Sequence, residues 1–212
     1  MTKDLEQQNF SNFSAVRVKI SDNMKKLFGT DGMRGEAGVF PLDAATIEIA
    51  GWSLARQFKE KLDRTPRFIT GRDTRESGDW IEKAFHKGAI AGGASCESAA
   101  VITTPGVAFL TKNFAFDAGI VISASHNPFH DNGIKIFSPT GRKLDEATEQ
   151  EIERDIFESR ESGVGSRESE IDSSKSSEYQ DAYLDYLADE FKDLRLENFK
   201  MVVDCANGAS CS

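Results

Sequence analysis

The sequence predicts an α/β fold: a three-layer α/β/α domain with a mixed, mostly parallel sheet, followed by the start of a second similar domain. Short apolar segments with the character of strands alternate with amphipathic helical segments up to Ile122, a pattern typical of parallel α/β sheets. Asn132 and Gly133 then predict a tight turn, so the strand that follows should run antiparallel to its neighbour.

Composition excludes several classes of protein. No apolar run in the 212 residues approaches the roughly 18 residues of a membrane-spanning helix, and the first residues lack the apolar core of a secretory signal. Cys96, Cys205 and Cys211 show no metal-ligand spacing, and their odd number argues against a disulfide framework. We therefore expect a cytoplasmic protein without a membrane partner.

The net charge of −9 is unevenly distributed. Residues 24–144 carry 16 basic and 13 acidic residues, whereas residues 145–212 carry 7 basic and 19 acidic ones. A mildly positive segment suits a small anionic ligand better than a nucleic acid, because nucleic-acid binders usually present a strongly basic face. We expect no nucleic-acid partner, although a solvated acidic surface explains the asymmetry equally simply.

The chain begins with a polar stretch and a glycine-rich motif. Residues 1–23 are predicted to be an extension, with a short strand-like alternation at 16–20. Residues 26–38 hold four glycines around Arg34. Glycine lets backbone N–H groups approach an anion, and arginine can grip phosphate with a forked contact. An ordinary glycine-rich turn is the alternative, and glycine content alone favours it.

A helix should open at Pro41 and Asp43, because apolar residues then recur at helical spacing as far as Leu62. Residues 67–70 predict a strand that leads into the charged segment 71–75. The two arginines and the aspartate of that segment either hold a phosphate or fix the loop, with Asp73 pairing with one arginine to brace it.

Ser77 is a plausible N-cap for the next helix, which Gly92-Gly93 should end. We interpret His86 on that helix as a surface or boundary histidine. Residues 96–102 predict a strand, and a helix should follow with Thr104 as its N-cap and Pro105 at its first position.

The most informative stretch is residues 118–137. An apolar strand, 118–122, meets the polar loop 123–128, and a strand at 134–137 returns with Lys135. Open α/β sheets place their chemistry at such strand ends. The loop gathers the hydroxyl of Ser125, the imidazole of His126 and the amide of Asn127 near the ammonium group of Lys135.

The remainder predicts a helix capped by Asp145, a serine-rich linker at 159–177, a further helix from residue 178, and a strand at 201–204. We therefore divide the chain into a first domain at 24–158, the linker at 159–177, and the incomplete start of a second domain at 178–212.

Three kinds of chemistry can be weighed at the central loop. Adjacent residues such as Ser125 and His126 rarely point at each other, and no G-x-S-x-G motif is present, so a hydrolytic triad is disfavoured. His126 and His130 would need further ligands to hold a metal. A phosphoryl group on Ser125, with roughly −1.5 to −2 charges, would be balanced by Lys135 and Arg34. A polar turn capped by Asn127 is the alternative.

Six motifs together resemble those of the α-D-phosphohexomutase family. They occur in the family's order over about residues 26–210, and the wording between Phe129 and Lys135 favours its glucosamine branch. The motifs are GTDGMRG (29–35), DTRESG (73–78), TPGV (104–107), SASHNPF (123–129), DNGIK (131–135) and VDCANGA (203–209).

The resemblance implies roles for particular residues. Ser125 would be the phosphorylated serine, His126 and Asn127 would shape its loop, and Lys135 would be the general acid/base. Arg34 would help to hold phosphate, in a motif that begins with Gly29 and Thr30. Magnesium would be bound by the phosphate on Ser125 and by an Asp-x-Asp-x-Asp run, which residues 1–212 lack.

The expected activity is conversion of glucosamine 6-phosphate to glucosamine 1-phosphate through a bisphosphate, and we expect this chain to be the N-terminal portion of such an enzyme. Homodimer formation is left open. We expect this 212-residue chain alone to be inactive or nearly so. Two alternatives stay open: a non-catalytic truncated module, and a mutase for glucose or mannose phosphate.

Overall fold

A computed structural model describes residues 26–159 and 170–211. The predicted extension at 1–23, with its strand-like segment, lies outside these residues, and so does most of the predicted linker. None of the helices in the described ranges is both long enough and apolar enough to cross a bilayer.

The described residues form one six-stranded mixed sheet, as predicted, in the order β1-β2-β6-β5-β3-β4. β3 pairs in parallel with β4 and β5, whereas the other three pairings are antiparallel. The parallel share is smaller than predicted because the glycine-rich segment forms a β-hairpin, β1–β2, that adds to β6. The strands are Phe28–Gly29, Gly32–Glu36, Arg67–Arg72, Ser95–Val101, Ala118–Ile122 and Asp131–Phe137, numbered β1 to β6.

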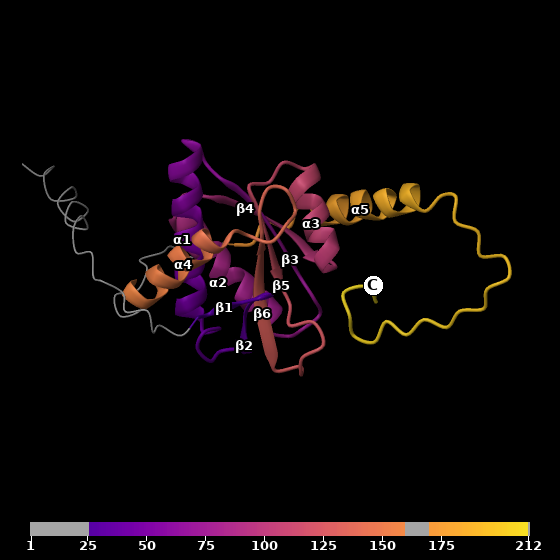
Figure 1. Cartoon of the computed structure of the whole chain (residues 1–212), viewed down its shortest axis with the longest axis horizontal. Helices are drawn as coiled ribbons and strands as arrows, with labels where there is room; N and C mark the ends of the chain where they lie inside the picture. Colours follow the sequence, from indigo (N-terminus) through magenta and orange to yellow (C-terminus); the bar gives the residue numbers. More distant parts are fainter. Residues whose placement is uncertain (1–25, 160–169, 212) are drawn as a thin grey trace, which may run out of the picture.

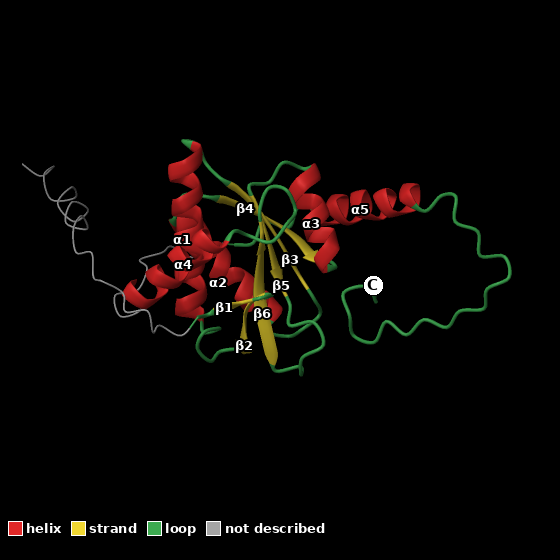
Figure 2. Ribbon diagram, in the orientation of Figure 1, coloured by secondary structure: helices red, strands yellow, loops and turns green. Residues whose placement is uncertain are grey.

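Five helices complete a three-layer arrangement (Figures 1 and 2). α1, α2 and α4 pack together on one face of the sheet, whereas α3 and α5 cover the other face. The apolar core divides accordingly into two clusters, one on each face. The helices are Ala44–Leu62, Gly78–Ala91, Thr104–Asn113, Glu146–Ser159 and Ser176–Glu190, numbered α1 to α5.

Local sequence explains how these helices begin. The carboxylate of Asp43 caps α1 by accepting from the backbone N–H of Thr46 at 3.1 Å, as predicted. α3 begins one residue earlier than predicted, because Thr103 is in an extended conformation and its hydroxyl accepts from the N–H of Gly106. Ser77 occupies the N-cap position of α2 but makes no capping hydrogen bond with its side chain.

The interpretation of His86 as a surface or boundary residue is wrong. Its side chain is fully buried, because this side of α2 packs against the sheet, where His86 Nε2 lies 2.9 Å from the hydroxyl of Thr70 on β3. A single histidine between Phe85 and Lys87 gives no local sign of such burial.

The segment after α4 contacts the sheet. The N–H of Ser98 on the edge strand β4 donates to the carbonyl of Asp172 at 2.7 Å, and α5 packs against β4 and α3. Residues 176 and 177, predicted to belong to the linker, form the first turn of α5. The division of the chain into domains stays a prediction.

The predicted strand at 201–204 is wrong in this structure. These residues form no regular element, and most of their surface is exposed. A strand requires a hydrogen-bonded neighbour, and no segment of the described residues pairs with them. Figure 2 shows the chain after α5 as a long loop that returns towards the sheet.

Candidate active site

The parallel pairing of β3 and β5 brings two loops together at the carboxyl ends of these strands. The N–H of Asp73, after β3, donates to the carbonyl of Ile122 at 3.1 Å. The hydroxyl of Ser123, after β5, donates to the Asp73 carboxylate at 2.7 Å. The loop that follows β5 is thus fixed to the end of β3.

Ser125 is exposed on this loop. Its backbone is left-handed, with φ of 57°, a conformation that costs roughly 1–2 kcal/mol for a residue with a Cβ. The N–H of Ser125 donates to the hydroxyl of Ser123 at 3.0 Å, and its own Oγ lies 3.4 Å from Nδ1 of His126. The hydroxyl is therefore accessible rather than enclosed in apolar packing.

Arg75 braces the same loop. Its guanidinium pairs with Asp73 at 3.0 Å and donates to backbone carbonyls of the loop, including those of Ser125 and Asn127. Of the two interpretations of the charged segment after β3, the structure supports a braced loop. The pairing with Asp73 was one of the two predicted alternatives, whereas the contacts with backbone carbonyls were not predicted.

The turn between β5 and β6 lies earlier than predicted. Asp131 donates its N–H to the carbonyl of Pro128 at 3.1 Å and accepts a hydrogen bond from the side chain of Asn127 at 3.0 Å. Asn132 and Gly133 lie inside β6, where they pair with Gly35 and Arg34 of β2.

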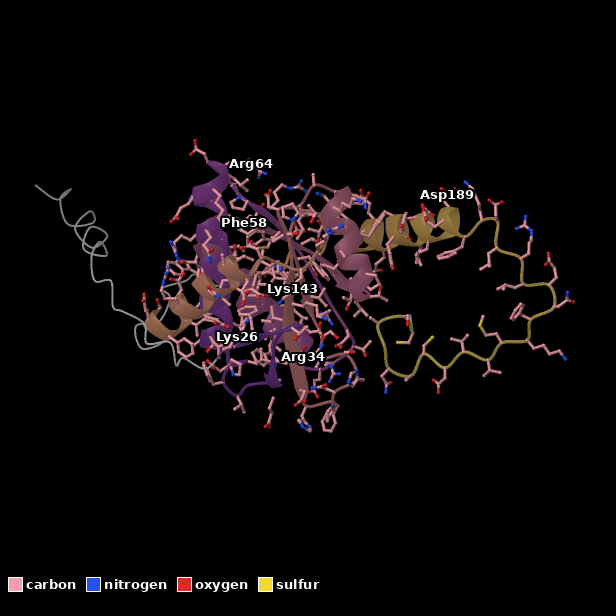
Figure 3. The ribbon with its side chains drawn as sticks, in the orientation of Figure 1. Lys26, Arg34, Phe58, Arg64, Lys143 and Asp189 are labelled. Atoms are coloured by element: carbon pink, nitrogen blue, oxygen red, sulfur yellow. The ribbon has the colours of Figure 1, made fainter. Side chains whose placement is uncertain are left out.

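A second group of predicted site residues gathers at the β1–β2 hairpin. Asp31, in its turn, lies 3.3 Å from Arg34 and 3.9 Å from Lys135. Thr30 is exposed in the same turn, and the carbonyl of Gly29 accepts from the ammonium group of Lys143 at 3.2 Å. Figure 3 labels Arg34 and Lys143. Three cations thus surround one hairpin turn.

Arg34 has donor capacity to spare. Its Nε is buried and has no hydrogen-bond partner within the described part of the chain, and its only ion pair there is with the exposed Asp31. A cation with so few hydrogen-bond partners is available to bind an anion.

A cavity of about 940 Å³ adjoins Ser125 and Asn127. His126, Arg34, Lys135, Gly29 and Thr30 do not line it. The structure therefore separates the predicted site residues into a cavity group and a hairpin group. The rest of the cavity lining comes from Glu36–Ala37, Asp73–Ser77, Trp80, Phe129–His130 and Cys205–Gly208.

Sequence reasoning missed two aromatic residues of this lining. Trp80 is partly buried in the first turn of α2, and Phe129 is 86% exposed on the loop after Ser125. An apolar residue between a proline and a histidine in a polar loop is the available signal for Phe129. No sequence signal marked Trp80 as a cavity-lining residue, because a tryptophan in a helix usually belongs to the core.

Residues 25–163 match the family described as phosphoglucomutase/phosphomannomutase, alpha/beta/alpha domain I. The chain belongs to this family.

Relatives within the phosphoglucomutase/phosphomannomutase family are similar along most of this chain. It is 43% identical over 192 residues to the phosphoglucosamine mutase of Koribacter versatilis, a match that covers 89% of this chain and 41% of that protein. It is 44% identical over 191 residues to the phosphoglucosamine mutase of Syntrophus aciditrophicus, covering 88% and 42% respectively. The chain thus spans about two fifths of the length of these curated relatives.

A solved family structure has the same fold. The phosphoglucomutase/phosphomannomutase family protein of Burkholderia thailandensis superposes with a TM-score of 0.60 at 22% identity, covering 82% of this chain and 37% of that protein. At this identity the likeness concerns the fold alone.

Proposed function

We propose that this chain carries the phosphoserine portion of a phosphoglucosamine mutase, which interconverts glucosamine 6-phosphate and glucosamine 1-phosphate. The observation that supports this most is the presentation of Ser125: exposed, left-handed, and on a braced loop beside a cavity of about 940 Å³. The phosphoglucosamine mutase relatives, at 40–44% identity, favour glucosamine as the sugar.

In the proposed reaction the Oγ–P bond of phosphoserine 125 breaks as a bond forms between phosphorus and a hydroxyl oxygen of the sugar phosphate. Lys135 acts as the general base that takes the proton of that hydroxyl, and it returns this proton to the released Oγ of Ser125. The bisphosphate then returns the phosphoryl group from its other end to Ser125. Such transfers depend chiefly on positioning and charge neutralisation, to which Arg34 contributes. His126 and Asn127 shape the loop.

A metal ion of the kind expected for the family would neutralise further charge on the phosphoryl group, and we propose magnesium. From this chain, a phosphate on Ser125 would supply an oxygen ligand. Within residues 26–159 and 170–211 no three His, Cys, Asp or Glu side chains are grouped so as to hold a metal. The described residues therefore do not form a metal site by themselves. The roles proposed for Lys135 and Arg34 do not depend on a bound metal ion.

Mass spectrometry of the purified chain tests the assignment of Ser125. After incubation with glucose 1,6-bisphosphate and magnesium, we expect one added phosphoryl group, mapped to the peptide that contains Ser125. Ser125→Ala should abolish the addition, whereas Ser173→Ala, at an exposed serine before α5, should retain it. A phosphoryl group found only on another residue would contradict the proposal.

Sugar specificity, location and assembly stay predictions. The family description also names phosphoglucomutase and phosphomannomutase. Competition among glucosamine, glucose and mannose 6-phosphates would therefore test the preference for glucosamine.

We still propose that the chain alone is nearly inactive, and steady turnover of glucosamine 6-phosphate by the purified chain would refute this. Cytoplasmic location and homodimer formation are likewise untested expectations.

A further inference from the structure

The guanidinium of Arg75 makes an unusually complete set of hydrogen bonds. One donor pairs with a carboxylate, and the other four bind backbone carbonyls of the loop after β5 and of the first residue of β6. The contacts are Nε to Asp73 Oδ2 at 3.0 Å, Nη1 to the carbonyls of Pro128 at 2.5 Å and Asp131 at 3.0 Å, and Nη2 to those of Ser125 at 2.8 Å and Asn127 at 3.0 Å.

This set leaves Arg75 no free donor. A guanidinium has five N–H groups in a fixed planar fork, and each of the five has an acceptor. The side chain is only 10% exposed, although the residue lines the cavity beside Ser125. An arginine in this state cannot bind a phosphate without releasing part of the loop.

The same contacts hold a costly backbone conformation. Ser125 has positive φ, and the carbonyls of Ser125 and Asn127 converge on one Nη atom. Converging carbonyl oxygens repel one another unless a cation lies between them. A planar fork satisfies four carbonyls at once, whereas a lysine has only three donors and no fixed geometry.

We infer that Arg75 is a positioning residue: it fixes the left-handed conformation that presents the Ser125 hydroxyl, and it does not ligate the substrate phosphate. The role of Arg75 in phosphoryl transfer rests on the proposed function, whereas its role in fixing the loop conformation does not. Asp73 assists it by orienting Nε and by accepting from the hydroxyl of Ser123.

Hydrogen exchange on the full chain tests the hold on the loop. Arg75→Lys keeps the charge but loses the fork, so amide exchange in residues 123–131 should rise at least about tenfold while the interiors of β3 and β5 keep their protection. The matched control is Arg64→Lys, which alters a forked contact to Asp117 just before β5. Figure 3 shows Arg64 at the opposite end of the sheet from Arg34.

Unchanged loop exchange in Arg75→Lys would overturn the inference. An equal rise throughout the sheet would also overturn it, because that pattern indicates general loss of stability. The Arg64→Lys control should leave exchange in the loop unchanged.

Phosphoryl loading of Ser125 by glucose 1,6-bisphosphate separates positioning from ligation. Arg75→Lys should lower the loading rate at saturating donor at least about tenfold, with the half-saturating donor concentration nearly unchanged. A raised half-saturating concentration with an unchanged maximal rate would identify Arg75 as a phosphate ligand and overturn the inference. If the wild-type chain takes up no phosphoryl group, the proposed function loses support, and loop exchange alone then decides whether Arg75 positions Ser125.

Discussion

The side chain of Arg34 crosses directly over Gly133, its register partner on β6. A methyl group at Gly133 would lie 2.9 Å from Cγ of Arg34 and 2.9 Å from the carbonyl oxygen of Ser123. Glycine at this position therefore lets the arginine of the hairpin approach the loop that carries Ser125. Gly133 thus lies between Arg34 of the hairpin group and the backbone of the loop that carries Ser125.

Gly133→Ala should lower the free energy of unfolding by about 1–3 kcal/mol, because the added methyl group forces Arg34 and the Ser123 backbone apart. Urea unfolding measures the loss. Gly35→Ala on β2 is the control, because its nearest contact would be an ordinary 3.5 Å to Pro41. Equal stability of the two variants would show that the close approach at Gly133 is relaxed without cost.

The buried histidine predicts a pH dependence of stability. We assign the hydrogen of the Thr70 hydroxyl to Glu82, its nearest acceptor at 2.5 Å, so that Thr70 accepts from His86 Nε2. Nδ1 is then the unprotonated nitrogen, buried without a partner among the described residues. Burial lowers the pKa of His86, and the opposing attraction of Glu82 and Asp172 is smaller.

Because the pKa of His86 is lower in the folded state, the unfolded chain takes up the proton first. The contribution of His86 to the free energy of unfolding is fully present above the unfolded pKa of about 6.5. It is lost as the pH falls below that value, by at most about 1.4 kcal/mol per pH unit. Denaturant unfolding between about pH 7.5 and 5.5 should show this slope, and His86→Gln should reduce it. His126→Gln, which removes an exposed histidine, should not.

Tyr179 should contribute measurably to the docking of α5. Its hydroxyl donates to Glu97 on β4 at 2.6 Å. Burial alone would raise the pKa of Glu97, but hydrogen bonds from Tyr179, Lys175 and Arg67 outweigh it and lower that pKa. Tyr179→Phe should therefore cost about 1.5 kcal/mol of unfolding free energy at neutral pH, measured in urea.

The pH dependence of this cost checks its cause. A carboxyl group with a depressed pKa stabilises the fold above its unfolded value and loses that effect as the pH falls through the folded value. The difference between wild type and Tyr179→Phe should therefore shrink below about pH 4. Tyr183→Phe, on the same helix, is the control, and a cost as large as that of Tyr179→Phe would point to packing instead.

The three cysteines should differ in reactivity. Burial raises the pKa of Cys96 to about 12, so at pH 8 only about one thiol in 10⁴ is thiolate, the form that reacts with alkylating reagents. Cys205 and Cys211 are exposed. Iodoacetamide followed by peptide mapping should label these two and spare Cys96 until the chain is unfolded. Early labelling of Cys96 would indicate local opening of β4.

Some features of the molecule follow from the sequence because their causes are local. Apolar spacing predicted α1 and α2, the capping carboxylates of Asp43 and Asp145 marked where helices begin, and an uninterrupted apolar run predicted β5. The order of six short motifs predicted the family. Each of these signals lies within a few residues of what it specifies, so no knowledge of distant contacts was required.

What the sequence by itself determined was therefore the α/β class, most of the elements, and the serine loop at the end of β5. The tertiary structure alone decided that residues 28–36 form a hairpin, that His86 is buried, and that Arg75 braces the loop whereas Arg34 crosses Gly133. The hairpin strands pair locally, but the pairing of β2 with β6 and the other relationships join residues far apart in the sequence. They depend on sheet register and helix packing, which no local pattern encodes.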